Sequence, residues 1–184
     1  MDLAGKILIA MPALGDPRFA RSVILLCAHS DEGAMGLVVN HPAEATPFAT
    51  LLETLGIPRG SDARDIRVHL GGPVERGRGF VLHSDDWACG EGSMVVPGGL
   101  RMTATLEVLE ALASGGGPAR AMLALGYSGW GPGQLEGEIR RNDWLVADPV
   151  EEVIFALPDA EKWSSALRSL GIDPLTLSPV AGRA

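Results

Sequence analysis

Two apolar runs joined by a short polar reversal constrain the fold more than any other feature of this chain. The runs cover 22–29 (SVILLCAH) and 34–40 (AMGLVVN), and both are rich in the β-branched and large apolar residues that favour strands. The four residues between them, Ser-Asp-Glu-Gly at 30–33, suit a tight reversal. The sequence therefore predicts a β-hairpin, and with it an antiparallel sheet.

Strand and helix signals alternate through the rest of the chain. Short strands are expected at 7–14, 66–70, 79–83, 93–96, 120–127 and 144–147. Apolar residues at three- and four-residue steps predict helices from Thr46 to Gly56, from Thr103 to Gly115, around 134–140, and in a last helix that ends at Gly171. An early hairpin followed by interspersed helices is typical of an α+β fold with a mixed sheet.

Length and charge limit the protein further. The 184 residues, 46% of them hydrophobic, are enough for one sizeable core, so a single domain is expected over 1–184, with 175–184 as a flexible tail. The 15 Lys and Arg residues face 23 Asp and Glu residues, and the net charge of −8 disfavours binding along nucleic-acid phosphates or an anionic membrane.

Cysteine content and hydropathy indicate a compartment. Cys27 and Cys89 are too few for the disulfide framework of a small secreted scaffold. No apolar window approaches the ~18 residues that a membrane-spanning helix needs. A cytoplasmic location without membrane insertion is therefore expected.

Seven sequence blocks carry a resemblance to a known family. They are 5–12 (GKILIAMP), 19–24 (FARSVI), 33–42 (GAMGLVVNHP), 71–74 (GGPV), 78–83 (RGFVLH), 125–136 (LGYSGWGPGQLE) and 142–145 (NDWL). In this order the chain resembles the YqgE/AlgH family of uncharacterised bacterial proteins, nearly end to end. The resemblance implies a single α+β domain whose mixed, partly barrel-like sheet is surrounded by helices. It implies no established reaction, although some relatives carry the label of a transcriptional regulator.

The candidate ligand-binding residues are polar, glycine and aromatic positions near predicted strand and helix ends: Asp16, Arg21, Ser22, Asn40, Gly71, Gly72, His83, Ser128, Trp130, Gln134 and Glu136. If the sheet brings them together, Arg21 can pair bidentately with a carboxylate or phosphate. The alternative is structural. In that case Asp16 pairs with Arg21, Asn40 satisfies a turn, and Glu136 favours a helix N-terminus.

Ser128 lies in a Gly-Tyr-Ser-Gly-Trp segment between a predicted strand and a predicted helix, which is the setting of a hydrolase nucleophile elbow. That fold requires a histidine after the serine, whereas the last histidine here is His83, so no catalytic residue is assigned. The same glycine-rich turn, 126–133, offers a second hypothesis, since its free N–H groups can dock an anion.

Metal and nucleic-acid motifs are weak. Cys27 and His29 are two apart on a predicted strand and would share one face, yet the other histidines and Cys89 lack ligand spacing, so no metal or cofactor is expected. Arg59, Arg64, Arg67, Arg76 and Arg78 form a mildly basic stretch. Without interleaved aromatic residues it is predicted to be a solvated surface.

Three functions remain open. The favoured one is non-catalytic binding of a small ligand or a protein partner, with a regulatory or accessory role. Direct DNA binding as a transcriptional regulator is the alternative. A hydrolase-like enzyme that uses the 126–136 turn comes third.

Overall fold

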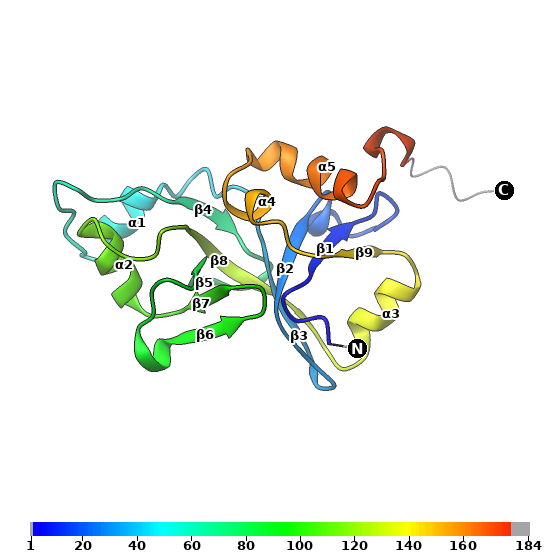
Figure 1. The fold of residues 1–184 in the computed structure, drawn as a ribbon, viewed down its shortest axis with the longest axis horizontal. Helices are drawn as coiled ribbons and strands as arrows, with labels where there is room; N and C mark the ends of the chain where they lie inside the picture. The colour runs from blue at the N-terminus through cyan, green and yellow to red at the C-terminus, as the bar shows by residue number, and fades with distance from the viewer. Residues whose placement is uncertain (1, 178–184) are drawn as a thin grey trace.

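The fold is built on one curled sheet of nine strands (Figure 1). The structure is a computed structural model that describes residues 2–177. Its strands are β1 (Ile7–Ala10), β2 (Val23–Ser30), β3 (Gly33–Val38), β4 (Arg67–Leu70), β5 (Val74–Ser84), β6 (Ser93–Val96), β7 (Leu100–Thr103), β8 (Ala121–Trp130) and β9 (Trp144–Ala147). They are ordered β6-β7-β5-β8-β3-β2-β1-β9, and β4 pairs with β8 alongside this path.

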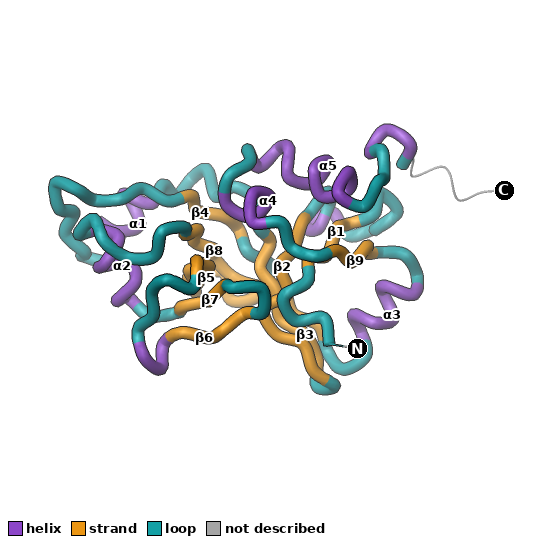
Figure 2. Tube along the Cα trace, viewed as in Figure 1, coloured by secondary structure: helices purple, strands orange, loops and turns teal. Residues whose placement is uncertain are grey.

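Within residues 2–177, five α-helices flank the sheet (Figure 2). They are α1 (Phe48–Thr54), α2 (Leu106–Ala113), α3 (Gln134–Arg140), α4 (Glu151–Phe155) and α5 (Asp159–Ser169), with short 3-10 turns at Pro17–Phe19, Gly90–Gly92 and Pro174–Thr176. The predicted hairpin is confirmed as β2–β3. The predicted α+β fold with a mixed, partly barrel-like sheet is also confirmed, since β4–β8 is parallel and the other strand pairs are antiparallel.

The long strand β8 joins the two halves of the sheet. Its first residues pair with β5 and β4, and its last three, from Ser128 to Trp130, pair with β3. One strand therefore belongs to both halves. The concave face lies at the place where β8 passes from one half to the other.

Apolar side chains on both faces of the sheet explain the helical layers. In β1, Ile7 and Ile9 point into a central cluster that also receives Trp163 and Leu167 of α5. Leu8 faces the other way, into a cluster under α3. A third cluster lies beneath α1 and α2. A strand that is buried on both faces has a continuous run of apolar residues in its sequence, and β1 is such a strand.

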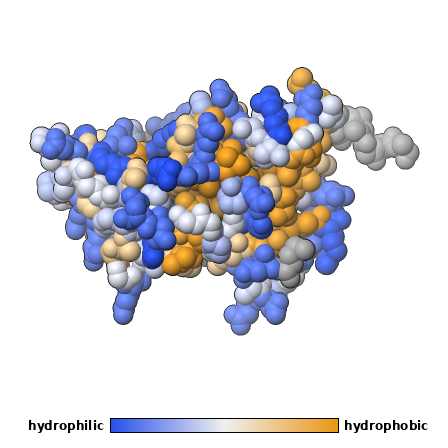
Figure 3. Space-filling view, in the orientation of Figure 1, coloured by the Kyte–Doolittle hydropathy of each residue, from blue (hydrophilic) through white to orange (hydrophobic). Residues whose placement is uncertain are grey.

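The edge strand β6 carries exposed apolar residues. Met94 is 36% exposed and Val95 is 60% exposed. Figure 3 shows hydrophobic surface over β6 on this side of the molecule. None of the helices in residues 2–177 has the length and apolar character needed to span a bilayer.

Several predicted boundaries are wrong, for local reasons. Thr103 does not open a helix, because it ends the unpredicted strand β7, and α2 begins only at Leu106. Thr46 does not cap α1, since Pro47 occupies the N-cap position. The first strand ends at Ala10, before Pro12. Of the tail predicted over 175–184, residues 175 and 176 belong to the 3-10 turn Pro174–Thr176, and 178–184 lie outside the described residues.

The glycine-rich turn predicted at 126–133 also differs from the structure. Residues 126–130 are not a turn but the end of β8. The Gly71-Gly72-Pro73 segment connects β4 to β5, and β8 lies between these two strands. The chain crosses β8 there so closely that a Cβ on Gly71 would lie 2.3 Å from the Gly126 carbonyl oxygen. The glycines permit this crossing.

Candidate functional site

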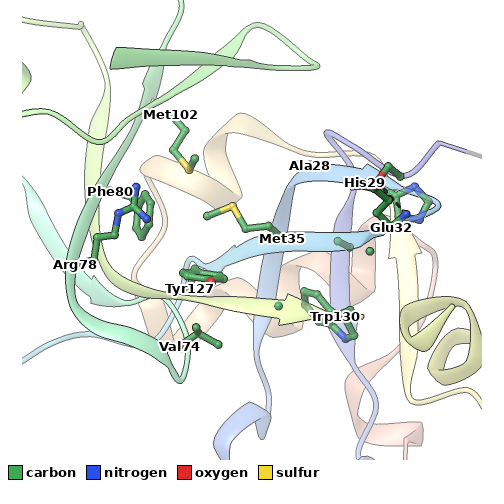
Figure 4. A pocket seen from close by; sticks show the side chains of 14 residues that line it. Ala28, His29, Glu32, Met35, Val74, Arg78, Phe80, Met102, Tyr127 and Trp130 are labelled. Carbon is green, nitrogen blue, oxygen red and sulfur yellow. Dashed lines mark hydrogen bonds between the residues drawn. The ribbon is translucent and has the colours of Figure 1, made fainter. Parts of the chain in front are cut away.

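The largest described cavities include one on the concave face of the sheet, which we call the concave cleft (Figure 4). Its volume is about 730 Å³. The lining residues come from β2, β3, the turn between them, β5, β7 and β8: Ala28, His29, Ser30, Glu32, Gly33, Ala34, Met35, Val74, Arg78, Phe80, Met102, Tyr127, Gly129 and Trp130. The cleft therefore depends on both halves of the sheet.

One end of the concave cleft is apolar. Met35, Met102, Phe80 and Tyr127 surround the open space in Figure 4. The Phe80 and Tyr127 rings meet edge to face, with 5.9 Å between their centroids. Methionine side chains adapt their shape to different apolar partners, and the aromatic rings provide fixed flat surfaces. This end is suited to an apolar or aromatic group.

Arg78 supplies the positive charge of the apolar end. Its guanidinium lies over the Phe80 ring, 5.0 Å from the centroid. Its ion pair with Glu75, at 3.4 Å, joins two side chains that are each more than half exposed. Such a pair contributes little stability, so the guanidinium can exchange Glu75 for an anionic ligand at small cost.

The local register of β5 places Arg78 at this position. Val74 pairs with Tyr127 and Gly79 pairs with Leu125, so four residues of β5 stand opposite the single residue Gly126. We call these four residues, 75–78, the β5 excursion. Gly126 has a φ of 73°, and the carbonyl oxygen of Val74 would lie 2.8 Å from a Cβ there. Position 126 needs a glycine because the four residues of the β5 excursion pass too close to it for a side chain.

The other end of the concave cleft lies at the β2–β3 turn and is polar. His29 Nε2 is 2.7 Å from Glu136 Oε1, and its Nδ1 accepts a hydrogen bond from the Leu3 N–H at 3.2 Å. A backbone hydrogen bond, followed by the bond with His29, lowers the pKa of Glu136 below its ordinary value. Glu136 itself lines a second cavity beside α3. His29 thus connects the turn to α3.

Cys27 and His29 do not share a face as predicted. A β-bulge between Leu26 and Ala28 reverses the alternation of side chains, which sends Cys27 into the central cluster and His29 toward α3. Burial raises the pKa of the Cys27 thiol to about 12, so the reactive thiolate is disfavoured. Within residues 2–177, no group of three or more His, Cys, Asp or Glu side chains could hold a metal ion.

Four predicted residues near the start of β2 have structural contacts. Asn40 accepts a hydrogen bond from the Val23 N–H and donates one to the Arg21 carbonyl, both at 2.8 Å. Ser22 Oγ donates to the Phe19 carbonyl, and Arg21 lies over the Trp163 ring of α5. Asp16 pairs with Arg18, so the predicted Asp16–Arg21 pair is wrong. These contacts fix the entry into β2, and none of these residues lines the concave cleft.

Ser128 and His83 are buried. Ser128 Oγ donates to the Gly71 carbonyl at 3.2 Å, so the serine fastens the chain crossing instead of standing on an exposed elbow. His83 contacts the Ser84 carbonyl and Thr103 Oγ1, and burial lowers its pKa. Gly71 and Gly72 approach the backbone of β8.

The residues at the start of α3 fasten this helix to the sheet. Gln134 Oε1 accepts a hydrogen bond from the Gly131 N–H at 3.0 Å. This N–H is therefore not free to bind an anion, as the hypothesis of an anion site at the 126–133 turn required. Trp130 Nε1 and Trp144 Nε1 both donate to Glu138 Oε2, at 2.9 and 2.8 Å. Of the eleven predicted residues, Trp130 alone lines the concave cleft.

Sequence reasoning missed both the residues of the concave cleft and a buried polar network. Lys162 is fully buried, and its Nζ donates to the Val39 and Ile154 carbonyls and lies 3.0 Å from Asp159 Oδ1. The same carboxylate oxygen is 2.8 Å from His69 Nε2. Lys162 lies four residues before the buried Ala166 on α5, and this helical spacing could have indicated that Lys162 is on the buried face.

Four of the five arginines in the arginine-rich stretch are exposed, as predicted, and two of the five donate hydrogen bonds to the protein's own backbone. Arg64 donates to the Gly116, Pro118 and Ala119 carbonyls. Arg67 donates to the carbonyls of residues 155–157 at the end of α4. Both guanidiniums therefore support loops and helix ends.

Comparisons with known proteins agree on one family. Residues 7–175 match the AlgH-like family model. A UPF0301 protein of Cereibacter sphaeroides is 61% identical over 184 residues, covering 100% of both chains, and one of Paracoccus denitrificans is 57% identical over 185 residues, covering 100% of this chain and 97% of the relative.

Solved structures extend the match to the fold. The solution structure of AlgH from Pseudomonas aeruginosa superposes with a TM-score of 0.80 at 38% identity, over 100% of this chain and 95% of that one. A Corynebacterium diphtheriae protein, 23% identical, shares the fold with a TM-score of 0.70 over 99% and 92% of the two chains. The resemblance seen in the sequence blocks is confirmed, and the chain belongs to the AlgH-like family of uncharacterised bacterial proteins.

Proposed function

We propose that this protein is a non-catalytic binding module whose concave cleft takes an amphipathic partner with an apolar or aromatic part and an anionic group. The main support for this proposal is a cavity of about 730 Å³ that combines apolar side chains with the single guanidinium of Arg78. A cavity of this size falls within the range of about 300–1,000 Å³ typical of small-molecule sites.

The chemistry of the lining residues favours binding over turnover. His29 is held between Glu136 and the Leu3 N–H, and Ser30 Oγ accepts the Glu32 N–H. Hydrolysis by serine requires a base directed at the hydroxyl oxygen. The hydrogen bonds of these two side chains fix the β2–β3 turn, and they hold the polar end of the cleft in shape.

The cleft also provides a route from binding to regulation. Its lining joins the β2–β3 turn to the β5 excursion, two segments that are distant in the chain. An occupant that touches both would favour the arrangement in which both contacts form. A partner protein that contacts either segment would then distinguish the occupied from the empty state.

A charge-reversal experiment tests the proposal. Anilinonaphthalene sulfonate, an aromatic anion whose fluorescence rises in apolar surroundings, serves as the probe. The Arg78→Glu variant is expected to weaken its binding by about tenfold, because the variant loses an attraction and gains a repulsion of the sulfonate.

Arg76→Glu is the matched control. Arg76 belongs to the same β5 excursion and is exposed, but it does not line the concave cleft. Its reversal should change the dissociation constant by less than about twofold. Equal weakening by both variants would indicate general charge attraction, and unchanged binding by Arg78→Glu would contradict the role of the guanidinium.

A further inference from the structure

A third cavity lies between α1 and α2 on the other face of the sheet, and we call it the aliphatic groove. Figure 1 shows these two helices at the same end of the molecule. The groove has a volume of about 280 Å³. Its lining residues are Leu51, Leu55, Gly77, Arg78, Gly79, Val81, Thr103, Ala104, Thr105, Leu106, Leu109, Leu123 and Leu125. It shares Arg78 with the concave cleft but none of that cleft's aromatic residues.

Aliphatic surface continues from the floor of the groove to its mouth. Leu123 of β8 and Leu109 of α2 are 1% and 6% exposed, whereas Leu55 and Leu106 are 42% and 50% exposed. Leu55 is the C-cap residue that follows α1, and Leu106 begins α2. Covering such leucines is favourable by about 25 cal/mol for each Å² of apolar surface removed from water. The mouth of the groove is therefore suited to a flexible alkyl chain.

One end of the groove is polar and carries positive charge only. Val81 of β5 pairs with Thr103 of β7, so the β5 excursion lies next to the residues that lead from β7 into α2. Arg78 is the single charged side chain among the groove's lining residues. An anionic group at this end meets the Arg78 guanidinium, whose partner Glu75 is exposed and does not line the groove, so the charge of the lining residues is complementary to an anion.

We infer that the aliphatic groove binds a medium-chain alkyl carboxylate, with the chain between α1 and α2 and the carboxylate at Arg78. A water-sized unit takes about 30 Å³ of liquid volume, and a methylene group is close to this size, so 280 Å³ holds roughly nine such units. The inference does not rest on the proposed function of the concave cleft, because the alkyl chain contacts a separate set of side chains on the opposite face of the sheet.

Decanoate, kept below its micelle-forming concentration, is the probe for this site. It is titrated by calorimetry and by NMR of leucine and methionine methyl groups. Saturable binding should shift the methyl signals of Leu51, Leu109 and Leu123, which line the groove, whether or not those of Met35 and Met102 in the concave cleft also move. Shifts confined to the two methionines would overturn the inference and would leave the proposed function of the concave cleft intact.

Leu106→Glu is the decisive variant, with Leu170→Glu as its matched control. Leu106 is half exposed at the first position of α2, where the helix dipole favours a carboxylate, so the variant should fold. Its new charge should weaken decanoate binding by about tenfold. Leu170 is 40% exposed after α5 and does not line the groove, so its substitution should have less than about a twofold effect.

The head group is tested with a cation of the same chain length, decyltrimethylammonium. The inference predicts binding at least about tenfold weaker than that of decanoate, because Arg78 repels a cation. Equal affinity of the two amphiphiles, or equal decanoate binding by the wild type and Leu106→Glu, would show that the groove does not select an alkyl carboxylate.

Discussion

Individual residues carry much of the polar organisation in the interior, and Asp159 is the clearest case. Its carboxylate lies within 3.0 Å of Lys162 Nζ and within 2.8 Å of His69 Nε2. Burial alone would raise the pKa of Asp159, but hydrogen bonds from His69 and Lys162 outweigh it and lower the pKa to about 2. Burial also lowers the pKa of Lys162. The three side chains therefore depend on one another for their charge states.

Acid should reveal this dependence. The folded-state pKa of Asp159 lies below the unfolded value, so its contribution to stability is complete above about pH 4 and is lost as pH falls toward 2. The Asp159→Asn variant should lose about 3 kcal/mol of unfolding free energy at pH 7, because Lys162 stays buried without its counterion. Between pH 4 and 2 its stability should change less with pH than that of the wild type. Urea unfolding at several pH values measures both effects, and parallel pH curves for the two proteins would contradict the assignment.

At the scale of elements, one carboxylate of α3, that of Glu138, joins this helix to two strands of the sheet. Glu138 accepts hydrogen bonds from Trp130 of β8 and Trp144 of β9, and its other oxygen accepts one from Gln134. The two indole rings also meet edge to face, 6.1 Å apart. One helix residue thereby connects two strands that are not neighbours in the sheet.

Loss of this carboxylate should be costly. Glu138→Ala leaves two indole N–H groups without their acceptor, and we expect about 2–3 kcal/mol of destabilisation with a change in tryptophan fluorescence. Glu136→Ala on the same helix removes one partly exposed bond to His29 and should cost about 1 kcal/mol or less. Denaturant unfolding of the two variants compares them directly. Equal destabilisation would show that the indole bonds do not hold α3.

The elements that the sequence predicted well were those specified locally. The hairpin, α3 and β9 follow from apolar runs and from the residues that bound them. The strand β7 was missed because its last residue, Thr103, was interpreted as the start of a helix, whereas pairing with β5 and β6 makes Leu100–Thr103 a strand. Gly126 and Gly129 suggested a turn, but both belong to β8, and Gly126 faces the β5 excursion.

The site was less predictable than the fold. Met35, Phe80, Met102 and Tyr127 read as ordinary strand residues, because the sequence does not say where a sheet curls. The polar residues that drew attention, such as Asn40 and Ser128, prove to satisfy backbone groups. Local polarity therefore indicated how the chain is fastened, and long-range pairing determined where the cavities lie.

At the scale of the whole molecule, the curl of the sheet creates the concave cleft. Met35 comes from the hairpin half, and Phe80 and Met102 come from the other half, while β8 joins the two. The central apolar cluster draws residues from both halves and from α4 and α5. The cleft is thus a property of the complete domain, in keeping with the single α+β domain that the structure shows.

The methionine distribution offers the most direct test of the central claim, which is that the concave cleft binds an amphipathic anion. Met35 and Met102 line the cleft, Met122 is buried, and Met94 lies on the edge strand β6. With ¹³C-labelled methionine methyl groups, titration with anilinonaphthalene sulfonate is predicted to shift Met35 and Met102 together along one saturable curve, while Met94 and Met122 stay in place. Unchanged Met35 and Met102 signals at saturation of the probe's fluorescence would contradict the account.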